Sequence, residues 1–210
     1  LDGKEDIFVT NGYRKYGSDN DSRIKINQTK IEYNNRVPLE MKKRLYDNLP
    51  SEKLSNLLYK NQGDLKFNEV GEESNILEPS FSNGAAYGDL DNDGDLEIVV
   101  NNIDDKAFIY KNLSVENGLG NYLKVNAKGN LSENFVKGTI YFENNHKIKE
   151  SKRVRGYLSS VSDELHFGLG KVSKIDSLVV EWNSGNKQVL YEIKANQTIT
   201  VNEKNSKLNN

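Results

Sequence analysis

One short stretch of the sequence, residues 89–97, gathers most of the side chains whose type and spacing could do chemistry. Acidic residues stand at its first, third, fifth, seventh and ninth positions: Asp89, Asp91, Asp93, Asp95 and Glu97. Alternate residues of a tight loop direct their oxygens to one side, and Gly94 permits the sharp turn after the third acid. Two such charges about 4 Å apart repel by about 4 kcal/mol at an effective dielectric constant of about 20. The pattern therefore predicts a bound cation, ligated by four carboxylates and by the backbone carbonyl of Asp95.

The predicted cation is Ca²⁺. Flexible ligation by many oxygens suits Ca²⁺, whereas Mg²⁺ keeps its waters and requires strict octahedral geometry. The chain has no Cys and two His, which excludes thiolate sites and disfavours zinc. An EF-hand is also excluded, because its twelfth position requires a bidentate Glu, and here Val100 stands there in a β-branched run. We expect the ion to fix the shape of a hairpin turn and to take no part in a reaction.

The start of the chain repeats part of the acidic pattern. When Gly3 is aligned with Gly94, an offset of 91 residues (from 3 to 94), acids align with acids and an apolar run follows. A second similarity links residues 58–61, Leu-Tyr-Lys-Asn, with residues 109–112, Ile-Tyr-Lys-Asn. Repeats of this kind indicate modular β architecture, such as the blades of a propeller. The first copy starts within the pattern, so we expect N-terminal blades of the same protein to be missing from this chain.

By the same alignment, Asp2, the carbonyl of Lys4 and Asp6 form the remnant of a second metal site. They correspond to the fifth, seventh and ninth positions of the loop at 89–97. Because the first copy lacks the first and third positions, we expect this remnant to bind a cation weakly or not at all.

Short strands must hold these loops in place. In the first half of the chain, apolar runs and turn residues predict strands at 7–10, 57–59, 65–70, 81–87, 97–101 and 107–110, with a hairpin turn at 61–64. Residues 12–55 are polar and interrupted, and we interpret them as an insertion that contains one helix. Pro38 suits the first turn of that helix, and Met41, Leu45 and Leu49 recur every four residues.

A polar stretch that contains glycine, at 114–121, marks a domain boundary. Beyond it, strands are predicted at 122–127, 139–143, 147–154, 164–167, 177–182, 188–192 and 198–201. Short strands at this spacing predict a β-sandwich or a small barrel. The predicted fold class is therefore all-β. We expect a fragment of a propeller at 1–115, with the insertion at about 12–55, a second β domain at 116–204, and a tail at 205–210.

Charge and hydropathy exclude further classes of function. The 29 Lys and Arg against 31 Asp and Glu give a net charge of −2, which argues against a nucleic-acid binder. No apolar run approaches the length of about 20 residues that a membrane-spanning helix needs. The serines near residue 160 lie in no Gly-x-Ser-x-Gly motif. His166 lies between apolar neighbours, where we expect a hydrogen-bonded structural role.

Two parts of the chain resemble known families. Residues 81–97, Phe-Ser-Asn-Gly-Ala-Ala-Tyr-Gly-Asp-Leu-Asp-Asn-Asp-Gly-Asp-Leu-Glu, resemble an FG-GAP/VCBS repeat, the integrin-α-like propeller blade with a Ca²⁺ loop. Residues 155–160, 165–170, 180–185 and 195–200 are similar, in family order, to segments of an ASPIC/UnbV domain. The pairing resembles the cartilage acidic protein family and cell-surface proteins of Bacteroidetes-like bacteria. Glu97 departs from the Asp of the family, and Asn183 stands where the family has Pro.

The resemblance implies an exported, calcium-dependent binding or adhesion module and no defined reaction. We therefore expect a non-enzymatic module at the cell surface or in the extracellular space, associated with the outer membrane if the protein is bacterial. Its partner would be an unknown protein or glycan ligand, with no nucleic acid and no membrane span in this chain. Two alternatives stay open. The chain could belong to a carbohydrate-active propeller enzyme, such as a polysaccharide lyase or hydrolase, or it could be a purely structural assembly domain.

Overall fold

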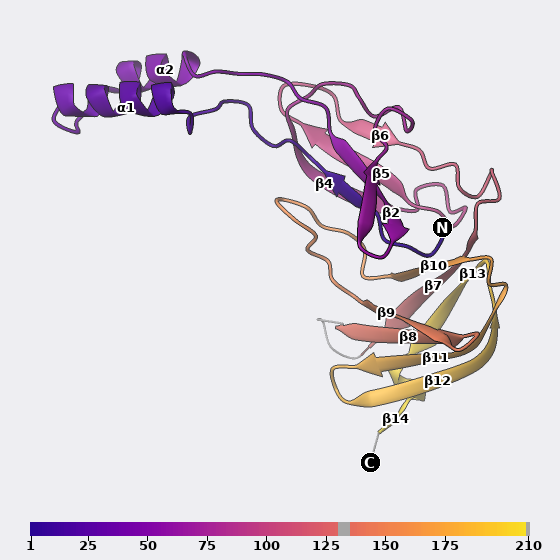
Figure 1. Ribbon diagram of the computed structural model, residues 1–210. Helices are drawn as coiled ribbons and strands as arrows, with labels where there is room; N and C mark the ends of the chain where they lie inside the picture. Colours follow the sequence, from indigo (N-terminus) through magenta and orange to yellow (C-terminus); the bar gives the residue numbers. More distant parts are fainter. Residues whose placement is uncertain (130–134, 209–210) are drawn as a thin grey trace.

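The computed structural model describes residues 1–129 and 135–208, and most of them lie in β-sheets (Figure 1). The described sheets form no closed barrel. They fall into two groups, one before residue 115 and one after residue 120, on either side of the predicted domain boundary. This arrangement agrees with the predicted all-β class.

Two antiparallel sheets of three strands each make up the part before residue 115. The first contains, in spatial order, β1 (Ile7–Val9), β2 (Leu57–Gly63) and β3 (Lys66–Glu69). The second contains, in spatial order, β4 (Ser82–Gly88), β5 (Glu97–Asn102) and β6 (Phe108–Tyr110). These strands lie where the apolar runs of the sequence predict them, within one to four residues at their ends.

The two sheets repeat one arrangement, because β1 pairs with β2 as β5 pairs with β6. The paired residues are Ile7↔Tyr59, Phe8↔Leu58 and Val9↔Leu57 in the first sheet, and Ile98↔Tyr110, Val99↔Ile109 and Val100↔Phe108 in the second. Every residue of the first set corresponds to one of the second by the offsets of the sequence repeat. The repeat is therefore present in the structure. In the second sheet β4 lies on the far side of β5, whereas β1 is an edge strand among the described residues.

The hairpin between β2 and β3 turns at Asp64 and Leu65, so the prediction of a turn at 61–64 is wrong in its position. Both residues have positive φ, 51° and 59°, as in the two-residue turns that join twisted antiparallel strands. Asn61 pairs with Phe67 inside the ladder, and β2 therefore continues through Gly63.

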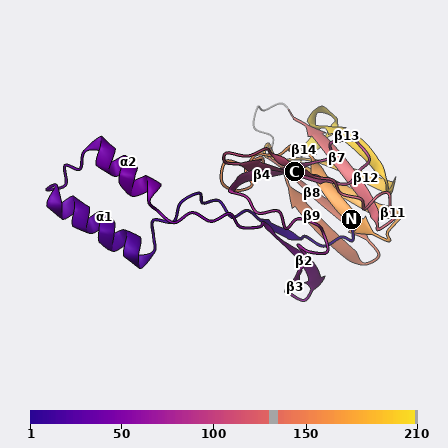
Figure 2. The ribbon, with the colours of Figure 1, turned by 90° about the horizontal axis from the view of Figure 1, so that it is seen from above.

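Most of residues 12–55 form a helical hairpin that projects away from the sheets (Figures 1 and 2). It contains α1 (Asn20–Glu32) and α2 (Leu39–Asp47), and Pro38 is the N-cap of α2. The sequence predicted α2 but missed α1, whose apolar residues form no continuous stripe. Helix α1 begins after Asp19, whose carboxylate accepts a hydrogen bond from the backbone N–H of Ser22. No helix in the described part of the chain is both long and apolar enough to cross a membrane.

The part after residue 120 is a sandwich of two sheets, which we call the C-terminal sandwich. One sheet has the order β10 (Leu165–Gly170), β7 (Asn121–Lys128), β13 (Gln197–Asn202), with β13 parallel to β7. The other has the order β14 (Lys207–Leu208), β12 (Asn186–Lys194), β11 (Lys174–Trp182), β8 (Val136–Phe142), β9 (Asn145–Glu150). Strand β14 lies inside the tail predicted at 205–210, where it pairs with the start of β12. Residues 209–210 of that tail lie outside the described residues.

The apolar core of the molecule lies in the C-terminal sandwich. Its buried side chains are Leu123, Val125, Val136, Ile140, Phe142, Leu165, Phe167, Leu169, Ile175, Leu178, Val180, Trp182, Ile193 and Val201. Burial of each large apolar side chain contributes about 1.5–3 kcal/mol. Among the described residues before 115, only Ile76, Phe81 and Val100 are buried apolar side chains. The N-terminal sheets therefore depend on other interactions for their stability.

Candidate metal centre

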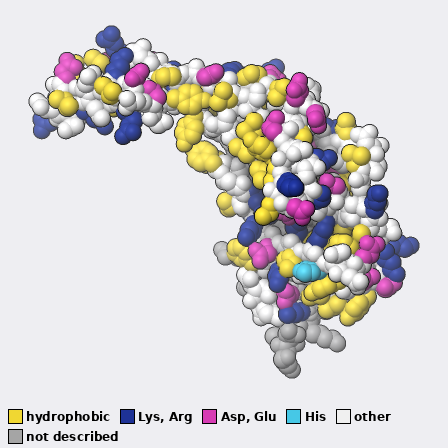
Figure 3. Space-filling model, viewed as in Figure 1, with side chains coloured by type: hydrophobic (Ala, Val, Ile, Leu, Met, Phe, Trp, Pro, Cys, Tyr) yellow, Lys and Arg dark blue, Asp and Glu magenta, His cyan; other side chains and the backbone are white. Residues whose placement is uncertain are grey.

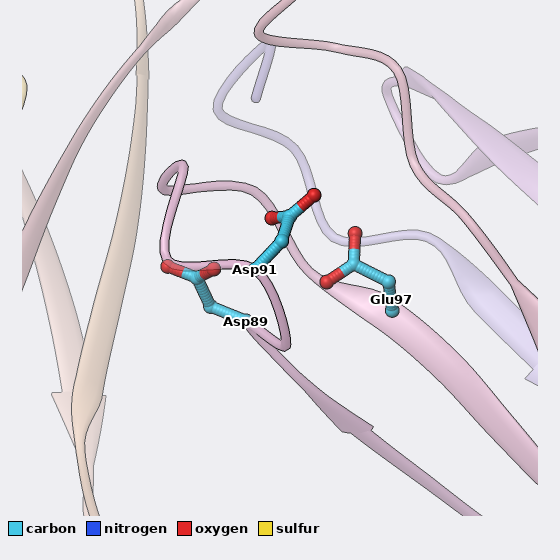
Figure 4. Close-up of side chains that lie close together, drawn as sticks. All are labelled: Asp89, Asp91 and Glu97. Atoms are coloured by element: carbon cyan, nitrogen blue, oxygen red, sulfur yellow. The ribbon is translucent and has the colours of Figure 1, made fainter.

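The acidic loop connects β4 to β5, and antiparallel pairing brings its two ends together. Gly88 pairs with Glu97 at the base of this hairpin, so Asp89 leaves one strand beside the residue that begins the other. Carboxylate oxygens of Asp89, Asp91 and Glu97 lie within 4.8 Å of one another. Figure 4 shows the three side chains directed toward a common space inside the loop.

Asp89 is almost completely buried, with 3% of its side chain exposed. Its Oδ2 accepts hydrogen bonds from the backbone N–H of Gly94 at 3.0 Å and from the ammonium group of Lys124 at 2.7 Å. Its Oδ1 is buried and has no hydrogen-bond donor among the described residues. One oxygen of this carboxylate is therefore fixed by the protein, and the other is available to a ligand.

Glu97 is buried at the start of β5, and its carboxylate faces the two acidic side chains from the protein side. Its Oε2 accepts from the N–H of Leu90 at 2.8 Å, and its Oε1 accepts from the N–H of Asn112 at 3.4 Å. Burial is the main cause that raises the pKa of Glu97, and the charges of Asp91 and Asp95 add to it. A cation in the loop would reverse this effect, because it favours the ionised carboxylate.

Asp91 is the exposed member of the group. A hydrogen bond from Lys111, at 3.0 Å, is the main cause that lowers the pKa of Asp91. The same ammonium group contacts the carboxylate of Glu116 at 2.9 Å. Lys111 therefore links the first acidic group to a second one.

The second group consists of Asp93, Asp95 and Glu116, whose oxygens also lie within 4.8 Å of one another. Asp95 is fully buried; its Oδ2 accepts from the N–H of Val115 at 2.9 Å, and its Oδ1 has no donor among the described residues. The N–H of Asp95 stabilises the ionised form of Asp93, but burial and the neighbouring carboxylates outweigh it and raise the pKa of Asp93.

The structure thus divides the five predicted ligands between two groups. Asp89, Asp91 and Glu97 meet in one, and Asp93 and Asp95 meet in the other. Sequence reasoning missed Glu116, which lies 19 residues beyond Glu97 and carries no local signal. It also assigned only the backbone carbonyl of Asp95 to the site, whereas the structure buries the side chain of this residue beside two other acids.

The donor set fits a hard cation. Two buried carboxylate oxygens, those of Asp89 and Asp95, have no donor among the described residues, although a buried charged oxygen without a partner is costly. All of the surrounding side-chain ligands are oxygens, and Ca²⁺ accepts irregular sets of oxygens more readily than Mg²⁺ does. Asp89, Asp91 and Glu97 would hold such an ion, and it would add to the positive charge that Lys111 and Lys124 bring to the loop.

The remnant at the start of the chain keeps the hydrogen bonds of the loop without its full set of acids. The N–H of Lys4 donates to Asp2 at 2.9 Å, as that of Asp95 donates to Asp93 at 3.0 Å. The N–H of Asn61 donates to Asp6 at 2.8 Å, which repeats the contact between Asn112 and Glu97. Asp2 and Asp6 are exposed, and among the described residues they join no group of three acids.

The C-terminal sandwich contacts the acidic loop directly. Besides the bond between Lys124 and Asp89, Nε2 of His166 donates to the carbonyl of Gly94 at 2.8 Å. The expectation that His166 is hydrogen-bonded is therefore confirmed. Burial is the main cause that lowers the pKa of His166, so its ring is neutral at pH 7. No local pattern in the sequence points to Lys124, which lies 35 residues from Asp89.

Comparison with known proteins identifies part of the chain. Residues 137–208 match the family described as ASPIC and UnbV. The matched span runs from β8 to β14 and lies wholly within the C-terminal sandwich, so the predicted resemblance of this part is confirmed. The comparison with curated proteins gives no match. The resemblance of residues 81–97 to an FG-GAP/VCBS repeat is not shown by these comparisons.

Proposed function

We propose that the chain is a non-enzymatic binding module stabilised by Ca²⁺ in the acidic loop, and the C-terminal part of a larger exported or cell-surface protein. The observation that carries this proposal is the buried Oδ1 of Asp89, which has no donor among the described residues and belongs to a carboxylate grouped with those of Asp91 and Glu97. A divalent cation stabilises such oxygens and removes the repulsion around them. Because the N-terminal sheets have little apolar core, an ion that joins β4 to β5 has a large effect on their stability.

The packing of the two N-terminal sheets supports a propeller of FG-GAP/VCBS blades. Phe8 of the first sheet meets Tyr110 of the second, with ring centroids 6.1 Å apart, on the face where Val100 is buried. In the repeat, Ile7 and Val9 correspond to Ile98 and Val100. Yet Ile7 and Val9 are 45% and 41% exposed, whereas Val100 is 0% exposed. In the second sheet this apolar face is covered by the first sheet. The equivalent face of the first sheet is exposed, and a preceding blade of a propeller would cover it in the same way.

The helical hairpin is the surface that we propose to contact the partner. Residues 12–55 contain ten Lys and Arg against six Asp and Glu, a net charge of +4 in a chain whose total is −2. Figure 3 shows Lys and Arg side chains at the outer end of this arm, where no other element covers them. Positive charge on an exposed arm favours a protein or glycan ligand that carries anionic groups.

The enzyme alternative has less support. A cavity of about 630 Å³ lies between residues 1–6, the base of the hairpin at Tyr87 and Leu96, and the strands β9 and β10. Its ionic side chains are mostly engaged with protein groups, as in the pairs Lys149–Glu5 and Lys152–Glu150. The ring of His166 is bound to Gly94. These contacts favour a structural role for the groups that line the cavity over acid–base catalysis.

Calcium titration of the whole chain tests the proposal. Isothermal titration calorimetry should show saturable Ca²⁺ binding, which Asp89→Asn and Asp91→Asn each weaken while Asp64→Asn, at the exposed turn between β2 and β3, does not. No binding heat with Ca²⁺, or equal binding by all variants, would contradict the proposed site.

A glycan and protein binding screen, run with Ca²⁺ and with EDTA, then separates the three functions. The proposed module loses both thermal stability and partner binding in EDTA, and a variant with residues 19–48 replaced by a short Gly-Ser linker loses partner binding alone. Loss of stability without any partner favours the structural alternative, and turnover of a glycan favours the enzyme.

A further inference from the structure

The C-terminal sandwich contacts the N-terminal half at two equivalent points. Gly3 and Gly94 occupy the same position of the sequence repeat. The carbonyl of Gly94 accepts a hydrogen bond from His166 on β10 at 2.8 Å, and the carbonyl of Gly3 accepts one from Lys147 on β9 at 2.7 Å. The glycine carbonyl of each acidic turn therefore accepts a hydrogen bond from a side chain of the sandwich, although the two turns lie 91 residues apart in the sequence.

The contact at Gly94 depends on the shape of the loop. Gly94 has a φ of 105°, and a Cβ added to it would lie 1.9 Å from Cε1 of Tyr122. The ring of Tyr122 stacks on that of His166, with the centroids 6.2 Å apart and the planes at 9°. These two rings thus form a surface against which only a glycine in this backbone conformation fits.

The contact surface belongs to one face of the sheet β10-β7-β13. His166 pairs with Lys124, and Gly168 pairs with Tyr122, so the side chains of Tyr122, Lys124 and His166 share the outer face. Their neighbours Leu123 and Phe167 point into the core of the sandwich. The side chain of Lys124 is only 9% exposed, although it lies on the outer face. The acidic loop therefore covers this face as a docked partner.

We propose that cation binding in the acidic loop and docking of the C-terminal sandwich on that loop are coupled, with His166 and Tyr122 as the residues that detect the loop conformation. The inference rests on the proposed Ca²⁺ site. An ion held by residues 89–97 fixes the turn that presents the carbonyl of Gly94, and the docked sandwich in turn holds the loop in the conformation that binds the ion. Because such coupling is reciprocal, docking raises the affinity for the ion by the same factor by which the ion favours docking, and loss of the hydrogen bond at Gly94 lowers the affinity for the ion.

Lys124 belongs to the same interface, but we expect it to have the opposite effect on the affinity for Ca²⁺. Its ammonium group lies 2.7 Å from Oδ2 of Asp89 and 3.6 Å from Glu164. It therefore supplies part of the positive charge of the loop when no ion is bound, and it repels an ion that binds through Oδ1. Loss of Lys124 raises the affinity for Ca²⁺, whereas loss of the donor on His166 lowers it. If both residues acted only through packing, loss of either one would change the affinity for Ca²⁺ in the same direction.

Calorimetric Ca²⁺ titration of four variants tests these opposite effects of His166 and Lys124 on the affinity for Ca²⁺. His166→Phe keeps the stacked ring but loses the donor, and we expect about a fivefold weaker affinity, the equivalent of one ordinary hydrogen bond of about 1 kcal/mol. His166→Gln restores a donor and should return the affinity to within about twofold of the wild type. Lys124→Met should bind Ca²⁺ more tightly, and Lys137→Met, on the far sheet, should leave the affinity unchanged. Equal affinity of His166→Phe and wild type would overturn the inference, as would weaker binding by Lys124→Met.

Spin labels measure the docking itself. The chain has no native Cys, so Ile109→Cys on β6 and Tyr191→Cys on β12, both exposed, give one label on each side of the contact. Double electron–electron resonance should give one narrow distance distribution with Ca²⁺ and a broad one in EDTA. In a Ca²⁺ titration, the Ca²⁺ concentration at the midpoint of this change should shift in His166→Phe by the same factor as the affinity for Ca²⁺. A distribution that stays equally narrow in EDTA would overturn the coupling while the wild-type titration still showed a Ca²⁺ site. If the wild-type chain binds no Ca²⁺ at all, the proposed function fails, and the coupling fails with it.

Discussion

Replacing Asp95 by Asn tests whether the acidic loop is built around a cation. The Asp95 carboxylate is fully buried and lies within 4.8 Å of that of Asp93, which corresponds to a repulsion of about 3.5 kcal/mol at an effective dielectric constant of about 20. Solvent near Asp93 reduces this value by about half. The amide also accepts a weaker hydrogen bond from Val115, at a cost of about 1 kcal/mol. In EDTA we therefore expect Asp95→Asn to raise the free energy of unfolding by about 1 kcal/mol, or the melting temperature by about 2–4 °C.

Calcium should change the order of stability of the two proteins. At a Ca²⁺ concentration of about 100 times the dissociation constant, the wild type gains about 2.7 kcal/mol, and the variant gains less because the loop has lost a negative charge. Urea unfolding followed by circular dichroism, with and without Ca²⁺, measures both differences. The exposed Asp64→Asn is the control, with a change within about 0.5 kcal/mol under both conditions. A variant less stable than wild type in EDTA would refute the account of Asp95, and an equal advantage with and without Ca²⁺ would show that the charge of Asp95 does not support a bound cation.

Three further predictions follow from the same contacts. Removal of Ca²⁺ should separate thermal unfolding into two transitions in scanning calorimetry, because the C-terminal sandwich has its own core and the N-terminal sheets do not; one unchanged transition would contradict this. Gly94→Ala should destabilise the chain by at least about 2 kcal/mol more than Gly185→Ala, since both positions have positive φ but only Gly94 lies against Tyr122; equal losses in urea unfolding would argue against the contact. Burial lowers the pKa of His166 below its ordinary value of 6.5. In EDTA we therefore expect the contribution of His166 to the free energy of unfolding to be full above about pH 6.5. It should decline as the pH falls through that value, because the unfolded chain takes up the proton first. His166→Phe should lack this part of the pH dependence, and an identical pH profile for the variant would show that the ring does not titrate in this way.

The sequence predicts most of the local structure and few of the contacts between distant residues. Alternation and turn residues locate the strands, because a half-buried strand needs one apolar side chain in every two. Helix α1 carries no such period, and its only local sign is the cap at Asp19. The turn between β2 and β3 was misplaced because Asn61, a common turn residue, is used instead to hold the backbone beside Asp6.

The candidate metal centre shows the same limit of sequence-based prediction. The spacing of the acids in residues 89–97 indicates a cation, because alternate residues of a loop share a side. It does not indicate Glu116 or Lys124, which reach the loop from a later turn and from the C-terminal sandwich. Such residues become part of the site only through the docking of β7 and β10, and the local sequence around the loop contains no record of that docking.

The position of the acidic loop explains why a bound ion and the docked C-terminal sandwich would together stabilise the second sheet. Three short antiparallel strands are at the lower limit for an independently stable sheet, which needs an apolar face that another layer can cover. In this chain the second sheet is covered on one side by Phe8 of the first, and its hairpin end is covered by Tyr122 and His166 of the sandwich. Both covers meet the sheet close to residues 89–97 and 108–112. Repulsion among the acids would loosen this end of the hairpin at the point where both neighbours bind. A cation placed there stabilises the sheet and both of its interfaces. We therefore expect that loss of the ion first weakens the contact between Gly94 and the C-terminal sandwich.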